Sequence, residues 1–441
     1  MNKAMRIKLC CALIMLAITV STGKLLADTH KEVYLPKKIS TVPDNNDFNN
    51  NNSEYSNKRS IQSENFVIYW AKEYGNDPMV NSNPEKRFNI ARMLPELERY
   101  YNYYVNELKV LKKGQSISDR YKILFFINGG TGTTAYGWGE EEKVGILWSP
   151  AVRINKEPYG VLAHELGHVF QFMAKCDNNN TCFDGPINEM GAQYLLWQVY
   201  PDWLTFENFH LKGFINHTHL AFLHPENQYH SPFLLEYWAE KHGKDFYGKL
   251  LRAVQKDEDP VQTYKRITKI SQDQFTAETF DAARHFVSWD LKRIKEIASP
   301  YANQHHTKLT SMTDGWYQVD AENCPENYGY NAIRLKVPDT GSKISLQFKG
   351  VAGMPGFYNV HPEIAGWKYG FMACSTTGKR SYGKVFDENS KAPSFTLPKN
   401  TKYLWLVITG APKQHLTLEK RAKHYDQWPY QFKLEGTDIE K

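Results

Sequence analysis

The sequence has little excess charge and none of the common nucleotide-binding patterns. Its formal net charge is +6, and four of the positive charges lie within the first 27 residues, so the remainder carries +2. That balance gives no electrostatic reason to expect nucleic acid or another polyanion as a partner. The glycine-rich stretch 128–134 fits neither Gly-x-x-x-x-Gly-Lys-Ser/Thr nor Gly-x-Gly-x-x-Gly, which disfavours phosphate binding there. We expect this stretch to be a loop that borders a cleft.

Cysteines are also scarce, with six in 441 residues. Cys10 and Cys11 lie at the beginning of an apolar run rather than after it, which argues against a lipoprotein anchor. Four cysteines remain: Cys176, Cys182, Cys324 and Cys374. Their proximity in sequence predicts the disulfides 176–182 and 324–374, although four cysteines allow three connectivities. Their irregular spacing makes a cysteine-rich metal site the weaker alternative.

The first 27 residues have the composition of a secretory signal peptide. Lys3, Arg6 and Lys8 precede an apolar run from Leu9 to Val20, and small residues follow. The run is too short to predict a membrane span. We therefore expect a secreted, extracellular protein without a membrane anchor after cleavage, with the periplasm as the alternative location.

Residues 28–64 are polar, with an asparagine-rich run at 44–53. A segment with so few apolar side chains buries too little surface to order itself. The composition predicts a flexible leader, with a removable pro-segment as the alternative.

Ordered structure is expected to begin near residue 65. The β-branched and aromatic stretches 66–70, 121–127 and 144–148 predict strands. Apolar residues at helical spacing predict a long helix over 84–109, which Pro95 should kink or interrupt. The strand at 144–148 directly precedes the next helix, and we expect it to be an edge strand that pairs with a substrate, an inner strand being the alternative.

A His-Glu-x-x-His pattern lies in the predicted helix 160–172. His164 and His168 are four residues apart, so both project from one helical face, and apolar side chains occupy roughly the opposite face. Imidazoles at this spacing can both reach one tetrahedral zinc ion, with Glu165 beside the open coordination position. Surface histidines that match the pattern by chance are the alternative.

A catalytic zinc ion has a third protein ligand, for which Glu189 is the best candidate. It lies in a second predicted helix that begins near Pro186. The extended pattern His-Glu-x-x-His-x-x-Gly-x-x-His is absent, because Gln171 and Ala174 occupy the positions of its glycine and last histidine. This excludes a metzincin.

His164, Glu165, His168 and the Asn188-Glu189 pair together resemble the gluzincin metallopeptidases. The resemblance implies a zinc-activated water with Glu165 as general base. Gluzincins often carry an acidic residue one turn after the third ligand, where this chain has Gln193, a weaker hydrogen-bond acceptor for a zinc histidine.

More narrowly, residues 65–243 resemble the secreted avirulence-type gluzincin proteins of bacteria. The strand from Asn65 to Trp70, Asn-Phe-Val-Ile-Tyr-Trp, carries this likeness. It implies contact with a host and a role in virulence.

The developing oxyanion of peptide hydrolysis needs a hydrogen-bond donor besides the metal. Gluzincins take such donors from the region downstream of the third ligand. Tyr229 and His230 fall there in a predicted loop, from which a side chain can extend across a cleft. Both are candidates, with ordinary packing as the alternative role.

After residue 300 the pattern changes to short alternating stretches separated by Gly, Pro, Asn and Asp. This predicts a C-terminal all-β sandwich over 314–441. Trp367 and Tyr369 could bind glycans if exposed, but filling the sandwich core is the favoured role.

The fold prediction is therefore α+β: a zincin-like metallopeptidase domain over 65–300, with a mixed sheet and a helical subdomain, followed by the sandwich. The functional prediction is a monomeric, secreted zinc endopeptidase with one Zn²⁺ per chain, acting on a protein or peptide such as an extracellular or cell-wall glycoprotein. The alternative is a protein that binds cell wall or host factors and carries a non-catalytic zinc site.

Overall fold

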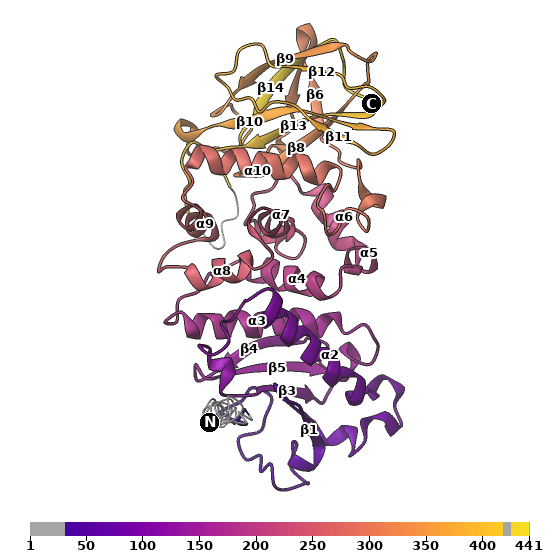
Figure 1. Cartoon of the computed structure of the whole chain (residues 1–441), viewed down its shortest axis with the longest axis vertical. Coiled ribbons are helices and arrows are strands. Elements are labelled where there is room, and N and C mark those ends of the chain that lie inside the picture. The colour runs from indigo at the N-terminus through magenta and orange to yellow at the C-terminus, as the bar shows by residue number, and fades with distance from the viewer. Residues whose placement is uncertain (1–30, 418–424, 441) are drawn as a thin grey trace, which may run out of the picture.

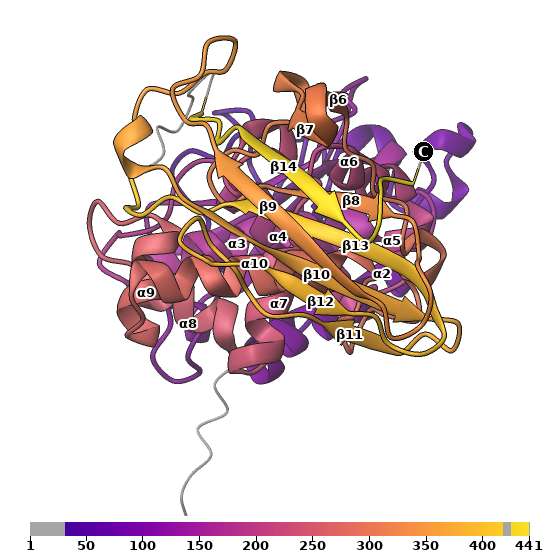
Figure 2. The same cartoon turned by 90° about the horizontal axis from the view of Figure 1, so that it is seen from above.

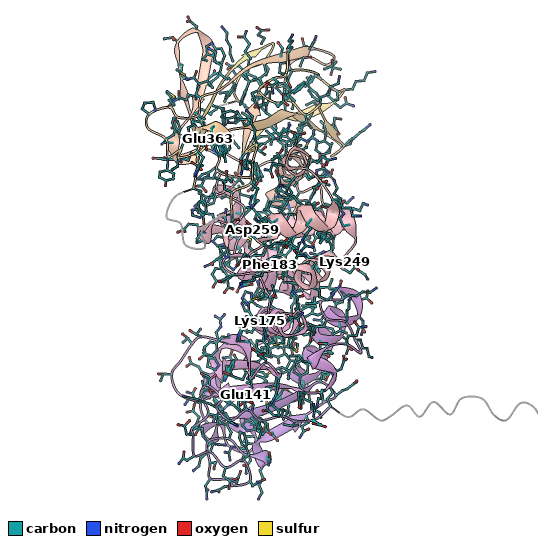
Figure 3. All side chains as sticks on the ribbon, turned by 90° about the vertical axis from the view of Figure 1, so that its left-hand side faces the viewer. Glu141, Lys175, Phe183, Lys249, Asp259 and Glu363 are labelled. Atoms are coloured by element: carbon teal, nitrogen blue, oxygen red, sulfur yellow. The ribbon has the colours of Figure 1, made fainter. Side chains whose placement is uncertain are left out.

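The computed structural model describes residues 31–417 and 425–440. The predicted signal peptide lies outside this range. The chain is a mixed α+β structure with three successive layers along its long axis (Figure 1). An N-terminal sheet lies at one end, a group of helices in the middle and two further sheets at the other end. In the side view of Figure 3, Glu141 marks the N-terminal sheet and Glu363 the opposite end.

The N-terminal sheet has the strand order β1-β2-β3-β5-β4. Its strands are β1 (Ser60–Gln62), β2 (Phe66–Trp70), β3 (Ile123–Asn128), β4 (Tyr136–Glu140) and β5 (Val144–Pro150). β2, β3 and β5 run parallel, and β1 and β4 are antiparallel to their neighbours. The central strands are continuous apolar runs because both of their faces are covered.

β5 is an inner strand, which corrects the prediction that residues 144–148 form an edge; on this side of the sheet the edge is β4. β5 lies between β3 and β4. A Cβ atom on Gly137 would lie 1.9 Å from the carbonyl oxygen of Glu165, and one on Gly139 would lie 2.1 Å from the Phe172 ring. The glycines thus let β4 lie directly against the neighbouring helix, although alternate glycines are depleted in ordinary strands.

Two helices accompany this sheet. α2 (Ile90–Asn102) begins later than predicted and continues past Pro95 into a π-helical turn, Tyr103–Glu107. α3 (Gly160–Asp177) packs against β4 and β5. The predicted helix 84–109 is therefore shorter, and Pro95 does not interrupt it. The helix predicted at 160–172 is present.

Residues 31–64 are folded against the sheet, so the prediction of a flexible leader is wrong. Tyr55 is 1% exposed and Arg59 is 2% exposed. The Arg59 guanidinium donates to the Asn51 carbonyl at 2.7 Å, and Asn46 exchanges two hydrogen bonds with the Tyr55 backbone at 2.9 and 3.1 Å. Asparagine side chains and the buried Arg59 cation form hydrogen bonds with the backbone groups of these turns. The segment is therefore ordered although it buries little apolar surface.

The middle layer consists of short helices, as the apolar spacing predicts. They are α4 (Ile187–Val199), α5 (Trp203–Phe206), α6 (Asn208–Asn216), α7 (Phe233–His242), α8 (Phe246–Ala253), α9 (Pro260–Thr268) and α10 (Gln272–Val287). Capping boxes begin α9 at Asp259 and α10 at Ser271. No helix in the described part of the chain is long and apolar enough to cross a membrane.

The C-terminal layer is built from two antiparallel sheets, ordered β11-β10-β13-β8 and β12-β9-β14-β7-β6. Their strands are β6 (Leu309–Ser311), β7 (Trp316–Val319), β8 (Tyr330–Leu335), β9 (Lys343–Gly350), β10 (Trp367–Ser375), β11 (Arg380–Tyr382), β12 (Ser394–Thr396), β13 (Thr401–Gly410) and β14 (Tyr430–Glu435). Seen from above, β9 and β14 cross over β10 and β13 (Figure 2). Trp367 and Tyr369 are 5% and 1% exposed, so both rings fill the sandwich core.

Neither predicted disulfide is present, because Cys176, Cys324 and Cys374 are all thiols. Along β10, Phe371 and Ala373 belong to the sandwich core, whereas Cys374 packs in the core shared with the helices. Cys324 lies in the sandwich core. The proposed partners Cys324 and Cys374 therefore lie in different cores, a consequence of strand alternation that proximity in sequence does not reveal.

A buried carboxyl joins the helical layer to the sandwich. Glu326 accepts a hydrogen bond from the Ala221 backbone amide at 2.7 Å. Burial raises the pKa of Glu326 to about 7. Between the ordinary carboxyl pKa and this value the folded chain holds a proton that the unfolded chain has released, so stability falls as pH rises across that interval.

We predict that Glu326→Gln stabilises the protein at pH 8 by up to about 3 kcal/mol, because the neutral amide keeps the hydrogen bond without burying a charge. Little change is expected at pH 4.5. Urea unfolding followed by tryptophan fluorescence at both pH values measures this, with the exposed Glu322→Gln as a control. An equal effect of Glu326→Gln at both pH values would contradict it.

Candidate metal centre

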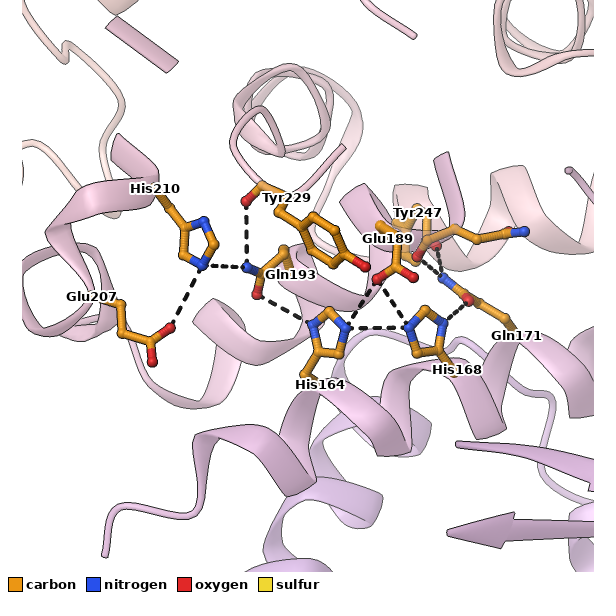
Figure 4. Close-up of polar contacts among 10 residues, drawn as sticks. His164, His168, Gln171, Glu189, Gln193, Glu207, His210, Tyr229 and Tyr247 are labelled. Carbon is orange, nitrogen blue, oxygen red and sulfur yellow. Dashed lines mark hydrogen bonds and ion pairs between the residues drawn. The ribbon is translucent and has the colours of Figure 1, made fainter. Parts of the chain in front are cut away.

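The structure brings His164, His168 and Glu189 together at one point between α3 and α4 (Figure 4). The Glu189 Oε2 atom lies 3.1 Å from His164 Nε2 and 3.2 Å from His168 Nε2, and the two Nε2 atoms are 3.2 Å apart. All three candidate ligand atoms lie within 4.8 Å of one another. The three residues predicted as metal ligands therefore converge.

Close packing of the two helices produces this convergence. A Cβ atom on Gly167 would lie 3.0 Å from the Ala192 Cα atom, so a larger residue would push α4 away from α3. In Figure 3, Lys175 lies on the α3 side of this junction and Phe183 lies in the loop that leads to α4. Glycine at this contact lets α3 and α4 approach closely enough for the Glu189 carboxylate to lie beside both imidazoles.

The electrostatics of these groups fit a cation. Burial alone would raise the pKa of Glu189, but hydrogen bonds from His164 and His168 hold this pKa well below its usual range. Glu189 is therefore a carboxylate, as metal binding requires. Two nitrogen ligands and one oxygen ligand are the donor set of catalytic zinc sites, which leave a fourth position open. The residues thus fit zinc.

Each histidine is oriented from behind by a glutamine. His168 Nδ1 lies 2.9 Å from the Gln171 Oε1 atom, and Gln171 Nε2 donates to the Asn188 carbonyl at 2.8 Å and to the Tyr247 hydroxyl at 3.0 Å. His164 Nδ1 lies 3.3 Å from the Gln193 Oε1 atom. Because the amide nitrogens already donate elsewhere, the oxygens accept, and each imidazole presents Nε2 to the metal position.

Gln193 thus lies next to a candidate zinc histidine, His164, as its position one turn after Glu189 predicts. Gln171 went unrecognised, although it stands three residues after His168 on α3 and could have been identified as its partner from helical spacing.

We predict that Gln171→Ala weakens zinc binding roughly 10- to 100-fold, because His168 loses the acceptor that fixes its tautomer and orientation. Gln171→Glu restores an acceptor and should bind more tightly than the alanine variant. Competition with a chromophoric chelator gives each Kd, and the exposed Gln115→Ala is the control. Unchanged affinity in Gln171→Ala would show that His168 needs no such support.

Glu165 lies beside the three candidate ligands. Its side chain is mostly buried, and burial raises the pKa of Glu165, although the neighbouring His164 and His168 oppose the rise. All four residues line one cleft of about 760 Å³. β4 borders this cleft through Tyr136 and Trp138, which are 42% and 38% exposed.

The two predicted oxyanion donors have different positions. Tyr229 lines the cleft, and Figure 4 shows its hydroxyl directed towards Glu189. Burial, together with the negative charge of Glu189, raises the pKa of Tyr229 to about 12, so the phenol keeps its proton. His230 is not among the residues that line the cleft, and its Nδ1 atom lies 2.9 Å from that of His210, which does line it. The geometry therefore favours Tyr229 over His230 as the oxyanion donor, and the role of His230 stays a prediction.

Comparisons with known proteins are sparse. A family model described as "Family of unknown function (DUF6055)" matches residues 26–441. No curated protein matches the chain.

Two solved structures show limited similarity. Accessory secretory protein 1, 2 and 3 of Streptococcus pneumoniae has 10% identity and a TM-score of 0.17, covering 29% of this chain and 84% of that chain. The glycosylation-associated Gap123 complex of Streptococcus agalactiae has 12% identity and a TM-score of 0.16, covering 29% and 38%. Scores this low carry no argument about function.

Proposed function

The chain belongs to DUF6055, a family of unknown function, and we propose that it is a zinc-dependent endopeptidase with a zincin-like catalytic domain. The observation that carries the proposal is the convergence of His164, His168 and Glu189 in one cleft, with Glu165 beside them. A closed structural site would use four protein ligands. Three ligands with an adjacent carboxylate that binds no metal favour catalysis.

His164, His168 and Glu189 would hold the ion. When bound, zinc would act as a Lewis acid on the scissile carbonyl and on the attacking water. With the ion in place, Gln171 and Gln193 would each accept from an imidazole Nδ1–H, which leaves Nε2 of both histidines to bind the metal. Glu189 supplies one negative charge, which balances part of the charge of a divalent cation.

Glu165 would move the protons of the reaction. Its largely buried carboxyl group has a raised pKa, which suits a group that must accept a proton near neutral pH and release it again. It would take a proton from the attacking water and deliver one to the leaving nitrogen. This transfer needs no other titratable group in the cleft.

The edge strand β4 would hold the substrate. Among residues 31–417 and 425–440, β4 pairs only with β5, so its outer backbone groups would bond to an extended peptide. Gly137 keeps this strand against Glu165. A bound peptide would therefore lie directly over the general base.

We further propose that the protein is exported through its predicted N-terminal signal and acts on extracellular proteins, including host glycoproteins. Sequencing the N-terminus of protein recovered from the culture medium tests export. We expect a mature chain that begins near residue 24 or 28. Protein that stays in the cell with residues 1–27 still attached would contradict export.

Incubation with unfolded proteins and with blocked peptides tests the activity. The purified chain should cut internal peptide bonds, detected by mass spectrometry, and peptides blocked at both ends should still be cleaved. Cleavage only of unblocked ends would replace the endopeptidase with an exopeptidase. Zinc binding without any cleavage would favour a binding protein with a non-catalytic zinc site.

We predict that Tyr229→Phe lowers kcat roughly 100-fold with little change in KM, because the phenol would donate to the oxyanion only as it develops. The ring is retained, so packing in the cleft is preserved. Steady-state kinetics on one blocked peptide measures both constants, with Tyr403→Phe in the sandwich as the control. A loss confined to KM would assign Tyr229 to substrate binding instead.

A further inference from the structure

The loop between β5 and α3 presents two cations to the cleft. Ala151, Ile154 and Tyr159 are buried and anchor this loop. Arg153 and Lys156 alternate with these anchors, are exposed and line the same cleft as the metal centre. The loop leads directly into Gly160, so these charges lie at the end of the cleft next to the N-terminus of α3.

Arg153 and Lys156 have no acidic partner among the residues that the structure describes. Within residues 31–417 and 425–440, no carboxylate forms an ion pair with Arg153 or Lys156. The carboxylate nearest to them in sequence, Glu157, is 3.2 Å from the Arg92 guanidinium. Exposed lysines and arginines are common, but two without partners in the wall of a cleft add a local positive potential where a substrate must lie.

The acidic groups of the cleft already have donors. Glu189 is bonded to both metal-centre histidines. Glu207 accepts from the Trp203 indole N–H at 3.1 Å and lies 3.6 Å from His210. Glu165 is largely buried in α3. The charged groups of the cleft wall that lack a partner of opposite charge are therefore the two cations, Arg153 and Lys156.

Apolar side chains line the cleft together with this loop. A Cβ atom on Gly160 would lie 2.2 Å from the Trp203 ring, so glycine lets this ring cover the first turn of α3. Trp203, Val161 and Leu196 line the cleft there. Apolar walls lower the local dielectric, which strengthens an ion pair formed beside them.

We propose that Arg153 and Lys156 form a carboxylate-binding subsite, and that favoured substrates place a carboxylate within a few residues of the cut bond. This rests on the proposed peptidase function and names its substrate class. The carboxylate is supplied either by an acidic side chain or by the C-terminus of the peptide. Both sources offer the same two-oxygen acceptor to a guanidinium and an ammonium group.

A matched peptide series tests the subsite. In one blocked sequence with a known cut site, a single Glu is moved through the positions on both sides of the bond, and each peptide has a Gln twin. Each is also made with a free and an amidated C-terminus. A preference for Glu over Gln at one position identifies a side-chain carboxylate, and a preference for the free acid identifies the terminus.

The double variant Arg153→Gln and Lys156→Gln should raise KM for the preferred acidic peptide about three- to tenfold, leave kcat unchanged and abolish the preference over its neutral twin. About 0.5 M salt should weaken the wild-type preference in the same way. The double variant Lys343→Gln and Lys399→Gln, at two exposed positions of the sandwich, removes the same two charges and is the control. A preference that persists in the double variant, or the absence of any preference, would overturn the subsite.

A binding arm separates failure of the subsite from failure of the peptidase. Fluorescence anisotropy measures the Kd of labelled acidic and neutral peptides for the Glu165→Gln protein, in which no turnover is needed. Selective binding that depends on Arg153 and Lys156, without cleavage by the unaltered protein, would refute the peptidase and support the subsite. Cleavage by the unaltered protein, with equal binding of the acidic and neutral peptides, would support the peptidase and refute the subsite.

Discussion

Replacing Glu165 by glutamine is expected to reduce peptide hydrolysis by at least about 1,000-fold. Glutamine has nearly the same shape as glutamate, so packing around α3 and the position of β4 over residue 165 are retained. The amide cannot accept a proton from the attacking water. The substitution therefore removes the general base and leaves the rest of the site in place. Steady-state cleavage of one blocked peptide, followed by mass spectrometry, measures the loss.

The zinc content of the Glu165→Gln protein is its internal control. Glu165 is not among the three candidate ligands, so one zinc ion per chain should remain, with an unchanged melting temperature. A variant that loses both zinc and activity would assign Glu165 to the metal centre rather than to proton transfer. Residual activity within tenfold of the unaltered protein would exclude it as the base.

Removal of the third ligand should have the next largest effect. We expect Glu189→Gln to weaken zinc binding by more than about 100-fold, beyond the usual cost of losing a group that only orients a ligand. Glu189 carries the negative charge between His164 and His168, at 3.1 and 3.2 Å from their Nε2 atoms. Hydrolysis at limiting zinc should fall in proportion to bound metal.

Chelator competition measures the zinc Kd, with the exposed Glu363→Gln in the sandwich as the control. Excess zinc should restore part of the binding to Glu189→Gln, because both histidines remain. An unchanged zinc Kd in this variant would show that another group completes the site.

The metal centre could be predicted because its geometry is mostly local. His164 and His168 are related by helical periodicity alone, and Glu189 follows on the next helix. Gln193 lies one turn beyond it and was recognised for the same reason. Such relations need the helix and its approximate packing, but no knowledge of the rest of the fold.

The errors arose where non-local packing decides the structure. The strand β4 was not predicted, because it lies against α3 through Gly137 and Gly139, a contact that depends on the fold. Arg59 holds together a polar segment through backbone carbonyls, a contribution that counting apolar residues misses. Cys324 and Cys374 lie in two different hydrophobic cores and so cannot pair. None of these relations has a periodic signal in the sequence.

The most direct test of the account is zinc content measured together with cleavage through one cycle of removal and return of the metal. The purified chain should contain one zinc ion, lose cleavage of an unfolded protein when a chelator removes this ion, and recover it when one equivalent of zinc is restored. Cleavage that survives complete removal of zinc, or a chain that binds no zinc, would contradict the central claim.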